Sequence, residues 1–164
     1  MTDFLNNLDP DANFFDSVDL HSKCNYYSVS SFNIEFKDSR SFIGFHINIR
    51  SLEANWDELK SFLDDLNFRF SVLVITETWL DSFSLHYNLP GYRCFHTVRD
   101  KKGGGVSILV DECFPVEHLK LTCVVNENYE ICSVQIRLGK ELVNIFGVYR
   151  PPRGSLHEFN SFFF

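Results

Sequence analysis

The sequence predicts a mixed α/β fold (α+β), in which helices pack on a mixed sheet. Three observations predict this class. An alternating apolar pattern, a helical pattern and a continuous apolar run follow one another near residue 41, which indicates a parallel crossover. Short strands separated by turns fill the second half, which indicates antiparallel hairpins. Of the 164 residues, 45% are hydrophobic and 16% aromatic, enough for the core of about one domain.

The first 40 residues differ from the rest in composition and in periodicity. They are rich in Asn, Asp and Ser, and they hold more acidic than basic residues. Neither a strand period nor a helix period is clear in them. We therefore expect residues 1–40 to form a loosely ordered acidic leader with room for one short helix or strand. Residues 41–164 are expected to form the folded domain.

Two strands are predicted at the start of this domain. In residues 43–49 every second residue is a large apolar one, so one face of this strand should be buried. The apolar residues between Ser71 and Thr76 are continuous, which indicates a strand buried on both faces. With a helix between them, the two strands form a right-handed parallel crossover.

The intervening helix is predicted from its cap and its apolar face. Asn55 is expected to cap the first turn, and Glu58 three residues later would complete a capping box. The large apolar residues that follow are spaced by three and four and share one face: Trp56, Leu59, Leu63 and Leu66.

Two hairpins are predicted in the second half. Their strands are residues 92–98 with 106–110, around a Gly-rich connection, and residues 130–138 with 142–149. In the second hairpin, Gly139 supplies the residue that a tight turn needs at positive φ. A helical pattern then begins, and the chain stops at Phe162-Phe163-Phe164. Because natural ends are usually polar and frayed, we expect the domain at 41–164 to be incomplete.

Composition argues against several classes of protein. The five cysteines are odd in number and include no Cys-x-x-Cys, which argues against a disulfide framework and a structural zinc site. No apolar run approaches the roughly 18 residues of a membrane helix, and the N-terminal residues lack a signal-peptide pattern. We therefore expect an intracellular protein with no membrane partner. A net charge of −7 disfavours a cationic DNA coat but allows a locally basic site.

Polar side chains stand at the ends of three predicted strands. Glu77 directly follows the most buried strand, where α/β proteins place ligand sites, and its carboxylate suits a hard divalent cation. Asn48 ends the neighbouring strand, so its amide is expected beside Glu77. Tyr149 and Arg150 precede two prolines that end a later strand, and they offer a phenol and a guanidinium to a phosphate. Taken singly, each also has a structural interpretation as a cap, a turn residue or a strand end.

The Gly-rich connection carries three basic residues, Arg99, Lys101 and Lys102. They are candidates for contact with a phosphate backbone, although the order of residues is not that of a P-loop. Taken alone, a solvated hairpin loop accounts for them better.

Five short motifs stand in a fixed order along the domain. They are Ile47-Asn48-Ile49-Arg50-Ser51-Leu52, Val74-Ile75-Thr76-Glu77-Thr78-Trp79-Leu80, Leu89-Pro90-Gly91-Tyr92, Gly103-Gly104-Gly105-Val106-Ser107-Ile108-Leu109-Val110 and Val148-Tyr149-Arg150-Pro151-Pro152. In this order they resemble the endonuclease domain of non-LTR retrotransposons, a branch of the endonuclease/exonuclease/phosphatase (deoxyribonuclease-I-like) superfamily. The resemblance covers about residues 41–164 and implies part of a four-layer α/β sandwich.

The resemblance also implies a function. Family members are Mg²⁺-dependent phosphodiesterases without another small-molecule cofactor, and this branch nicks DNA, for which a nuclear location is expected. By position, Asn48 matches the residue that positions the metal and the catalytic groups, and Glu77 matches the main metal carboxylate. Tyr149 matches the residue that orients the scissile phosphate. For Arg150, a phosphate contact is our inference.

Two later motifs of the family, Gly-Asp-x-Asn and Ser-Asp-His, are absent from this sequence. They supply a general base and phosphate contacts, which are typically worth about 10²–10⁴-fold in rate. We therefore expect this truncated chain, on its own, to be inactive and to hold Mg²⁺ weakly.

Two other functions stay open. The half-domain would act without catalysis, as a binding or decoy module whose acidic leader contacts a basic partner. Alternatively, it would belong to another phosphodiesterase of the superfamily, acting at apurinic sites or on phosphoinositide or sphingomyelin head groups. The run Tyr149-Arg150-Pro151-Pro152 favours the retrotransposon branch.

Overall fold

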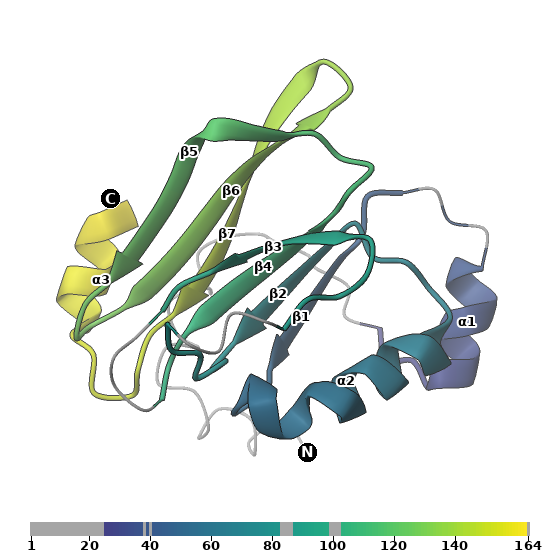
Figure 1. Cartoon of the computed structure of the whole chain (residues 1–164), viewed down its shortest axis with the longest axis horizontal. Coiled ribbons are helices and arrows are strands. Elements are labelled where there is room, and N and C mark those ends of the chain that lie inside the picture. Colours follow the sequence, from purple (N-terminus) through teal and green to yellow (C-terminus); the bar gives the residue numbers. More distant parts are fainter. Residues whose placement is uncertain (1–24, 38, 40, 83–86, 99–102, 164) are drawn as a thin grey trace.

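The structure, a computed structural model, describes residues 25–37, 39, 41–82, 87–98 and 103–163, without the side chains of residues 118–122 and 163. This part of the chain forms three helices and seven strands in two sheets (Figure 1). None of its helices is long and apolar enough to cross a membrane. Most of the predicted leader lies outside the described residues, and so do Arg99, Lys101 and Lys102.

The first sheet, sheet A, has the strand order β1-β2-β4-β3. Its strands are β1 (Gly44–Asn48), β2 (Val72–Thr76), β3 (Tyr92–His96) and β4 (Val106–Asp111). β1 pairs with β2 in parallel, and β4 runs antiparallel to both β2 and β3. Helix α2 (Leu52–Leu66) joins β1 to β2, so the predicted parallel crossover is confirmed.

The second sheet, sheet B, is antiparallel, in the order β5-β6-β7. Its strands are β5 (Val116–Val125), β6 (Glu130–Leu138) and β7 (Glu141–Tyr149). The predicted hairpin of β6 and β7 is confirmed, with Gly139 at φ +61° in its turn. β5 was not predicted from the sequence. Its pairing with β6 shifts register between Glu117 and Thr122, and such an irregular edge strand lacks a clean period of two.

The start of α2 differs from the prediction. The helix begins at Leu52, and its N-cap is Ser51, whose hydroxyl accepts a hydrogen bond from the Ala54 N–H at 3.3 Å. Asn55, the predicted cap, lies inside the helix at a kink with non-helical φ and ψ. Its side-chain amide donates to the Ile49 carbonyl at 2.9 Å. Both residues are good caps, and the tight connection from β1 favours the earlier one.

Two helices cover the outer face of sheet A (Figure 1). α2 buries Leu52, Leu59 and Leu66 against the sheet. Helix α1 (Val29–Phe36) packs beside it, so the end of the predicted leader contributes to this layer. α1 also makes aromatic contacts with the segment that follows α2, where the ring centroids of Phe32 and Phe68 lie 5.6 Å apart in an edge-to-face arrangement.

The inner face of sheet A packs against sheet B in a second apolar core. The sheets approach closely at Gly147, where a Cβ atom would lie 2.5 Å from Val106 Cγ1. Helix α3 (Leu156–Phe163) follows β7, as the helical pattern predicted. It is fixed to the β5–β6 turn by Asn128, whose side-chain amide donates to Glu158 at 2.7 Å. The described residues therefore stack a helical layer and two facing sheets.

Candidate active site

Asn48 and Glu77 meet where the two parallel strands end. In the β1–β2 register Asn48 lies opposite Thr76, and Glu77 is the next residue. The Asn48 Nδ2 donates a hydrogen bond to the Glu77 Oε1 at 3.0 Å. The expected juxtaposition of these side chains is therefore present in the structure. The bond orients the carboxylate and leaves its second oxygen and the amide oxygen for a ligand.

Backbone pairing continues beyond the ends of β1 and β2. The Ser51 N–H donates to the Glu77 carbonyl at 2.9 Å, and the Leu52 N–H donates to the Thr78 carbonyl at 2.9 Å. These segments are in unusual conformations, since φ is +50° at Arg50, +96° at Ser51 and +55° at Glu77. Such backbone persists only where the surroundings hold it, and it is common at functional sites.

The end of the Gly-rich connection packs on the segment that follows Glu77. The Trp79 N–H donates to the Gly104 carbonyl at 2.9 Å, and the Thr78 N–H donates to the Gly105 carbonyl at 3.3 Å. Gly105 has φ +90°, and a Cβ there would lie 2.4 Å from the Thr78 hydroxyl. Only glycine fits this position without a shift. This stretch therefore supports the Glu77 segment by backbone contacts.

A buried carboxylate links this edge of sheet A to sheet B. Glu130, at the start of β6, has no exposed surface, and its Oε2 accepts a hydrogen bond from the Gly105 N–H at 2.6 Å. The sequence interpretation did not single out Glu130. A signal was present, because a period of two along β6 puts Glu130 on the same face as the buried Cys132 and Val134.

Tyr149 lies at the same end of the molecule. It is the last residue of β7 and pairs with Glu130 in the β6–β7 register. Its side chain packs against the core between the sheets. Thr76 in turn pairs with Val106, the residue after Gly105. Strand pairing and the Gly105–Glu130 bond thus connect Asn48, Glu77 and Tyr149 along one edge of the sandwich.

Arg150 follows Tyr149 but is directed into its own turn. Its Nη1 donates to the Gly154 carbonyl at 3.1 Å. This contact holds the turn between β7 and α3, so the structural interpretation of Arg150 has direct support. Its predicted contact with phosphate stays a prediction.

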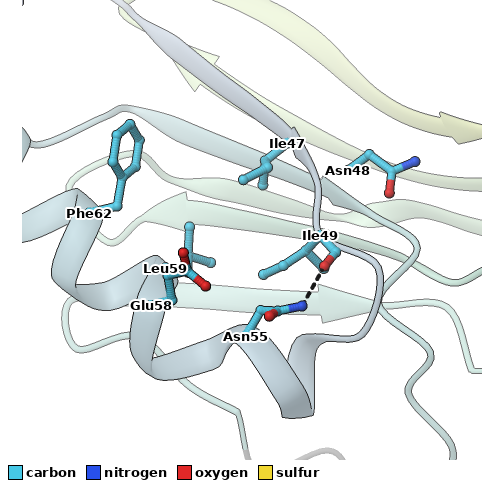
Figure 2. Close-up of a pocket in the computed structure, with 7 residues that line it drawn as sticks. All are labelled: Ile47, Asn48, Ile49, Asn55, Glu58, Leu59 and Phe62. Atoms are coloured by element: carbon cyan, nitrogen blue, oxygen red, sulfur yellow. Dashed lines mark hydrogen bonds between the residues drawn. The ribbon is translucent and has the colours of Figure 1, made fainter. Parts of the chain in front are cut away.

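An open cleft of about 410 Å³ lies between β1 and α2. Its apolar lining includes Ile47, Leu59 and Phe62, with Glu58 and Asn55 among its polar residues. The Asn48 side chain points away from Ile47 and the helix, toward the other face of β1 (Figure 2). Asn48 is one of the residues that line the cleft, whereas Glu77 is not, so the cleft borders the Asn48–Glu77 pair.

The donor set at the strand ends is small. No group of three or more His, Cys, Asp and Glu side chains suited to a metal occurs among the described residues. One carboxylate and one amide oxygen do fit Mg²⁺, which commonly keeps several waters and binds one or two carboxylates together with substrate phosphates. Glu77 and Asn48 are the residues that would hold such an ion.

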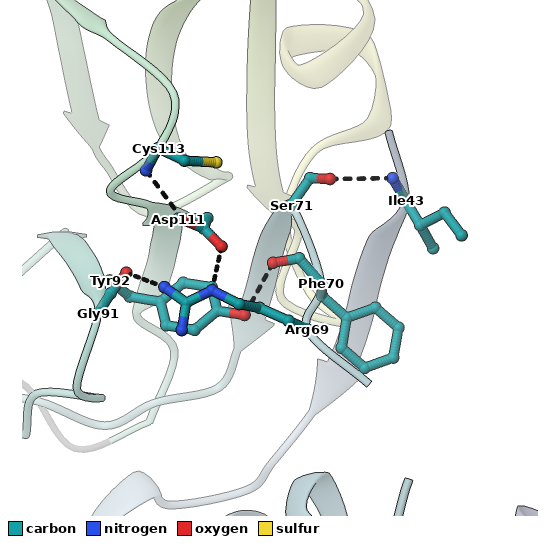
Figure 3. A network of polar contacts seen from close by, with 8 residues as sticks. All are labelled: Ile43, Arg69, Phe70, Ser71, Gly91, Tyr92, Asp111 and Cys113. Atoms are coloured by element: carbon teal, nitrogen blue, oxygen red, sulfur yellow. Dashed lines mark hydrogen bonds and ion pairs between the residues drawn. The ribbon is translucent and has the colours of Figure 1, made fainter. Parts of the chain in front are cut away.

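A second polar cluster lies at the opposite end of sheet A (Figure 3). Arg69 forms an ion pair with Asp111 at the end of β4, and its Nη2 donates to the Gly91 carbonyl at 2.7 Å. The guanidinium also lies over the Tyr92 ring, 5.0 Å from its centroid. Burial raises the pKa of Tyr92 to about 12, and the phenol donates to the Phe70 carbonyl at 2.7 Å. These groups are satisfied by one another, which indicates a structural role.

Comparison with known proteins found relatives by structure only. No family model and no curated protein matches the sequence. The structure is similar to that of D. rerio TDP2 complexed with a single-strand DNA product, with a TM-score of 0.52 and 14% identity over 73% of this chain. It is also similar to C. elegans TDP2, with a TM-score of 0.51 and 16% identity over 72% of this chain. The chain has the deoxyribonuclease-I-like fold.

The fold class predicted from the sequence is thereby confirmed. A weaker similarity, with a TM-score of 0.42 and 16% identity over 63% of this chain, relates it to the 3′ phosphatase NExo from Neisseria. The chain spans 50% of the D. rerio TDP2 chain, 37% of the C. elegans TDP2 chain and 40% of the NExo chain.

Proposed function

We propose that this chain carries the Asn48–Glu77–Tyr149 part of a Mg²⁺-dependent DNA endonuclease site of non-LTR retrotransposon origin. The observation that carries the proposal is the hydrogen bond between Asn48 and Glu77 at the ends of two parallel strands of a deoxyribonuclease-I-like fold. The motif order supports the retrotransposon branch. DNA as the partner is supported by the D. rerio TDP2 structure, whose ligand is a single-strand DNA product.

The roles follow from the chemistry of the side chains. Glu77 and the Asn48 amide oxygen would hold Mg²⁺, which when bound supplies positive charge to a phosphodiester oxygen. Asn48 also orients Glu77 through its amide N–H. Tyr149 is a rigid donor at the same edge and would donate its hydroxyl proton in a hydrogen bond to a phosphate oxygen.

Trp79 gives this site an aromatic surface. Its side chain is 39% exposed, between the buried Thr78 and Leu80, and its backbone has φ +56°. A bulky residue rarely adopts this conformation, so the backbone holds the indole outward at some cost. An exposed indole two residues from Glu77 suits stacking on a nucleobase.

We further propose that the 164-residue chain binds metal and DNA without cutting DNA. The described residues contribute one carboxylate to the site, and the sequence contains neither Gly-Asp-x-Asn nor Ser-Asp-His. General acid–base groups are typically worth about 10²–10⁴-fold in rate, and phosphate donors about 10²–10³-fold.

A nuclear location is part of the same proposal, because the DNA that this site would bind is chromosomal DNA.

The test is a metal titration followed by Trp79 fluorescence. The chain has two Trp residues, so Trp56→Phe leaves Trp79 as the only one. In this background Mg²⁺ should change the fluorescence saturably, and Glu77→Gln should abolish the change. Glu58→Gln, on the nearby cleft, is the matched control and should keep it. An equal response in Glu77→Gln would refute the metal site.

Nicking of supercoiled plasmid in Mg²⁺ tests activity separately. We expect intact plasmid with the native chain. Nicking that Glu77→Ala removes would refute the proposed inactivity while supporting the site. Nicking unchanged in Glu77→Ala would refute both. For the retrotransposon origin, the test is a reverse-transcriptase reading frame in the DNA around the gene.

A binding or decoy module is the second candidate function. The small donor set favours it, since one carboxylate and one amide make a weak metal site. DNA binding that is equal with Mg²⁺ and with a chelator, and unchanged in Glu77→Gln, would support this candidate over the endonuclease.

A further inference from the structure

Two cysteines face each other across the β5–β6 hairpin. Cys123 and Cys132 are directly opposite in the strand register. The Asn126 N–H donates to the Tyr129 carbonyl at 3.1 Å, which makes 126 and 129 a hydrogen-bonded pair. Hydrogen-bonded and non-hydrogen-bonded pairs alternate in antiparallel strands. Counting outward from this turn, Cys123 and Cys132 therefore form a non-hydrogen-bonded pair.

This position suits a disulfide. Opposite Cα atoms in a non-hydrogen-bonded pair are about 4.5 Å apart, with the side chains on one face and close together. A disulfide accepts Cα separations of roughly 4.4–6.8 Å. The register therefore places the two cysteines within the range of Cα separations that a disulfide accepts, at its short end.

The two thiols also differ in access. Cys132 is fully buried in the core between the sheets, whereas Cys123 is exposed. The Cys123 thiol donates to the His96 carbonyl at 4.0 Å, so it lies between the hairpin and sheet A. A reagent in solution can therefore reach Cys123, and Cys132 can be reached through Cys123.

We propose that Cys123 and Cys132 are an oxidation site that forms an intramolecular disulfide with a small disulfide oxidant such as oxidised glutathione. The Cys123 thiolate attacks one glutathione sulfur, forms a mixed disulfide and releases one glutathione thiolate. The Cys132 thiolate then attacks the Cys123 sulfur and releases the second. Two protein thiols lose their protons and two electrons, and one glutathione disulfide becomes two thiols.

The second step should be the slower one. Burial raises the pKa of the Cys132 thiol, and the neighbouring Cys123 raises it further. Little Cys132 is therefore thiolate at neutral pH, and the mixed disulfide on Cys123 should be detectable before the protein disulfide forms.

The site differs from the other cysteines that the structure describes. Cys94 lies opposite Leu109 in the β3–β4 register, and Cys113 follows the end of β4. Cys113 is exposed like Cys123, so it serves as a control for simple accessibility.

The experiment is to treat the full chain with oxidised glutathione, block the remaining thiols and map peptides by mass spectrometry. Trypsin leaves both cysteines in residues 121–137, between Lys120 and Arg137. A further cut after Glu127 or Glu130 separates them unless a disulfide joins them. We expect the joined peptides in the native chain and in Cys113→Ala. In Cys132→Ala we expect a lasting glutathione adduct on Cys123.

Two results would overturn the proposal. One is a native chain that ends with glutathione on Cys123 and a free Cys132 thiol. The other is a disulfide from either cysteine to a different cysteine. Unfolding in urea gives a second measurement that needs no variant: the oxidised chain should unfold at higher urea than the reduced chain, because the bond restricts the unfolded hairpin. Equal midpoints for a chain shown to be fully cross-linked would contradict the expected stabilisation by the bond.

Discussion

The side chain of Glu130 links sheet B to the edge of sheet A through a single hydrogen bond. It is fully buried, and it accepts the hydrogen bond of an N–H group that is itself buried next to the candidate site. A buried acceptor is tolerated when it is paired, and removing it leaves the donor unsatisfied. The Gly105 N–H therefore needs an oxygen at this position.

Replacing Glu130 by Ala should lower the free energy of unfolding by about 1–3 kcal/mol, the cost of an orphaned buried donor. Glu130→Gln should cost less, since the amide oxygen still accepts from Gly105. The urea midpoint of each variant checks this order. Glu127→Gln, an exposed residue on the same hairpin, is the control and should leave the midpoint unchanged. A midpoint for Glu130→Ala equal to that of the control would contradict the assignment.

Among the elements, the contact between the sheets depends on a glycine. At Gly147 a Cβ would lie 2.5 Å from Val106 Cγ1 and 3.0 Å from Val74 Cγ1. Gly147→Ala should therefore overpack the core and lower the free energy of unfolding by about 1–3 kcal/mol. At Gly44, also in a strand, the nearest atom would be 3.4 Å away, so Gly44→Ala is the matched control and should be close to neutral. Thermal unfolding of both variants measures the difference in stability between them. Equal melting temperatures would contradict the prediction that the contact between the sheets has no room for a side chain at Gly147.

The helices and strands also show which features of the fold a short stretch of sequence predicts. The parallel crossover was predicted because its strands and helix carry clear periods within short windows. The cap of α2 was predicted wrongly because Ser51 and Asn55 are both suitable caps, and the choice depends on how β1 ends. β5 was not predicted because its register shift breaks the alternation.

For the whole molecule, the parts of the site that depend on neighbouring strands could be predicted from the sequence, and the parts that depend on the contact between the two sheets could not. Asn48 and Glu77 were predicted to meet because adjacent parallel strands bring their carboxyl ends together. The place of Tyr149 depends on the approach of two sheets, and its link through Glu130 and Gly105 joins residues 25 positions apart in the chain. No local pattern encodes that contact. The strand end before two prolines singled out Tyr149 as a candidate, and the family resemblance, which covers both sheets, assigned it to the same site as Asn48 and Glu77.

The Arg69–Asp111 ion pair lies at the end of sheet A away from the candidate site. We expect this pair to control the stability of the fold in acid. Burial by itself would raise the pKa of Asp111, but hydrogen bonds from Arg69 and from the Cys113 N–H outweigh it and lower that pKa. A carboxyl with a lowered pKa in the folded state stabilises the fold above its unfolded pKa of about 3.9, and this stability is lost as pH falls through the folded value.

Replacing Arg69 by Met should therefore lower the free energy of unfolding by about 1 kcal/mol at neutral pH, a figure reduced by the exposure of the guanidinium. The difference between variant and native chain should shrink as pH falls from about 4 through the lowered pKa of Asp111 in the native chain, below which Asp111 is protonated in both. Urea unfolding at a series of pH values measures this, with Arg137→Met, which removes the surface pair with Glu117, as the control. A cost for Arg69→Met that stays constant down to pH values where the native chain unfolds would mean that Arg69 acts through packing on Tyr92 and not through its charge.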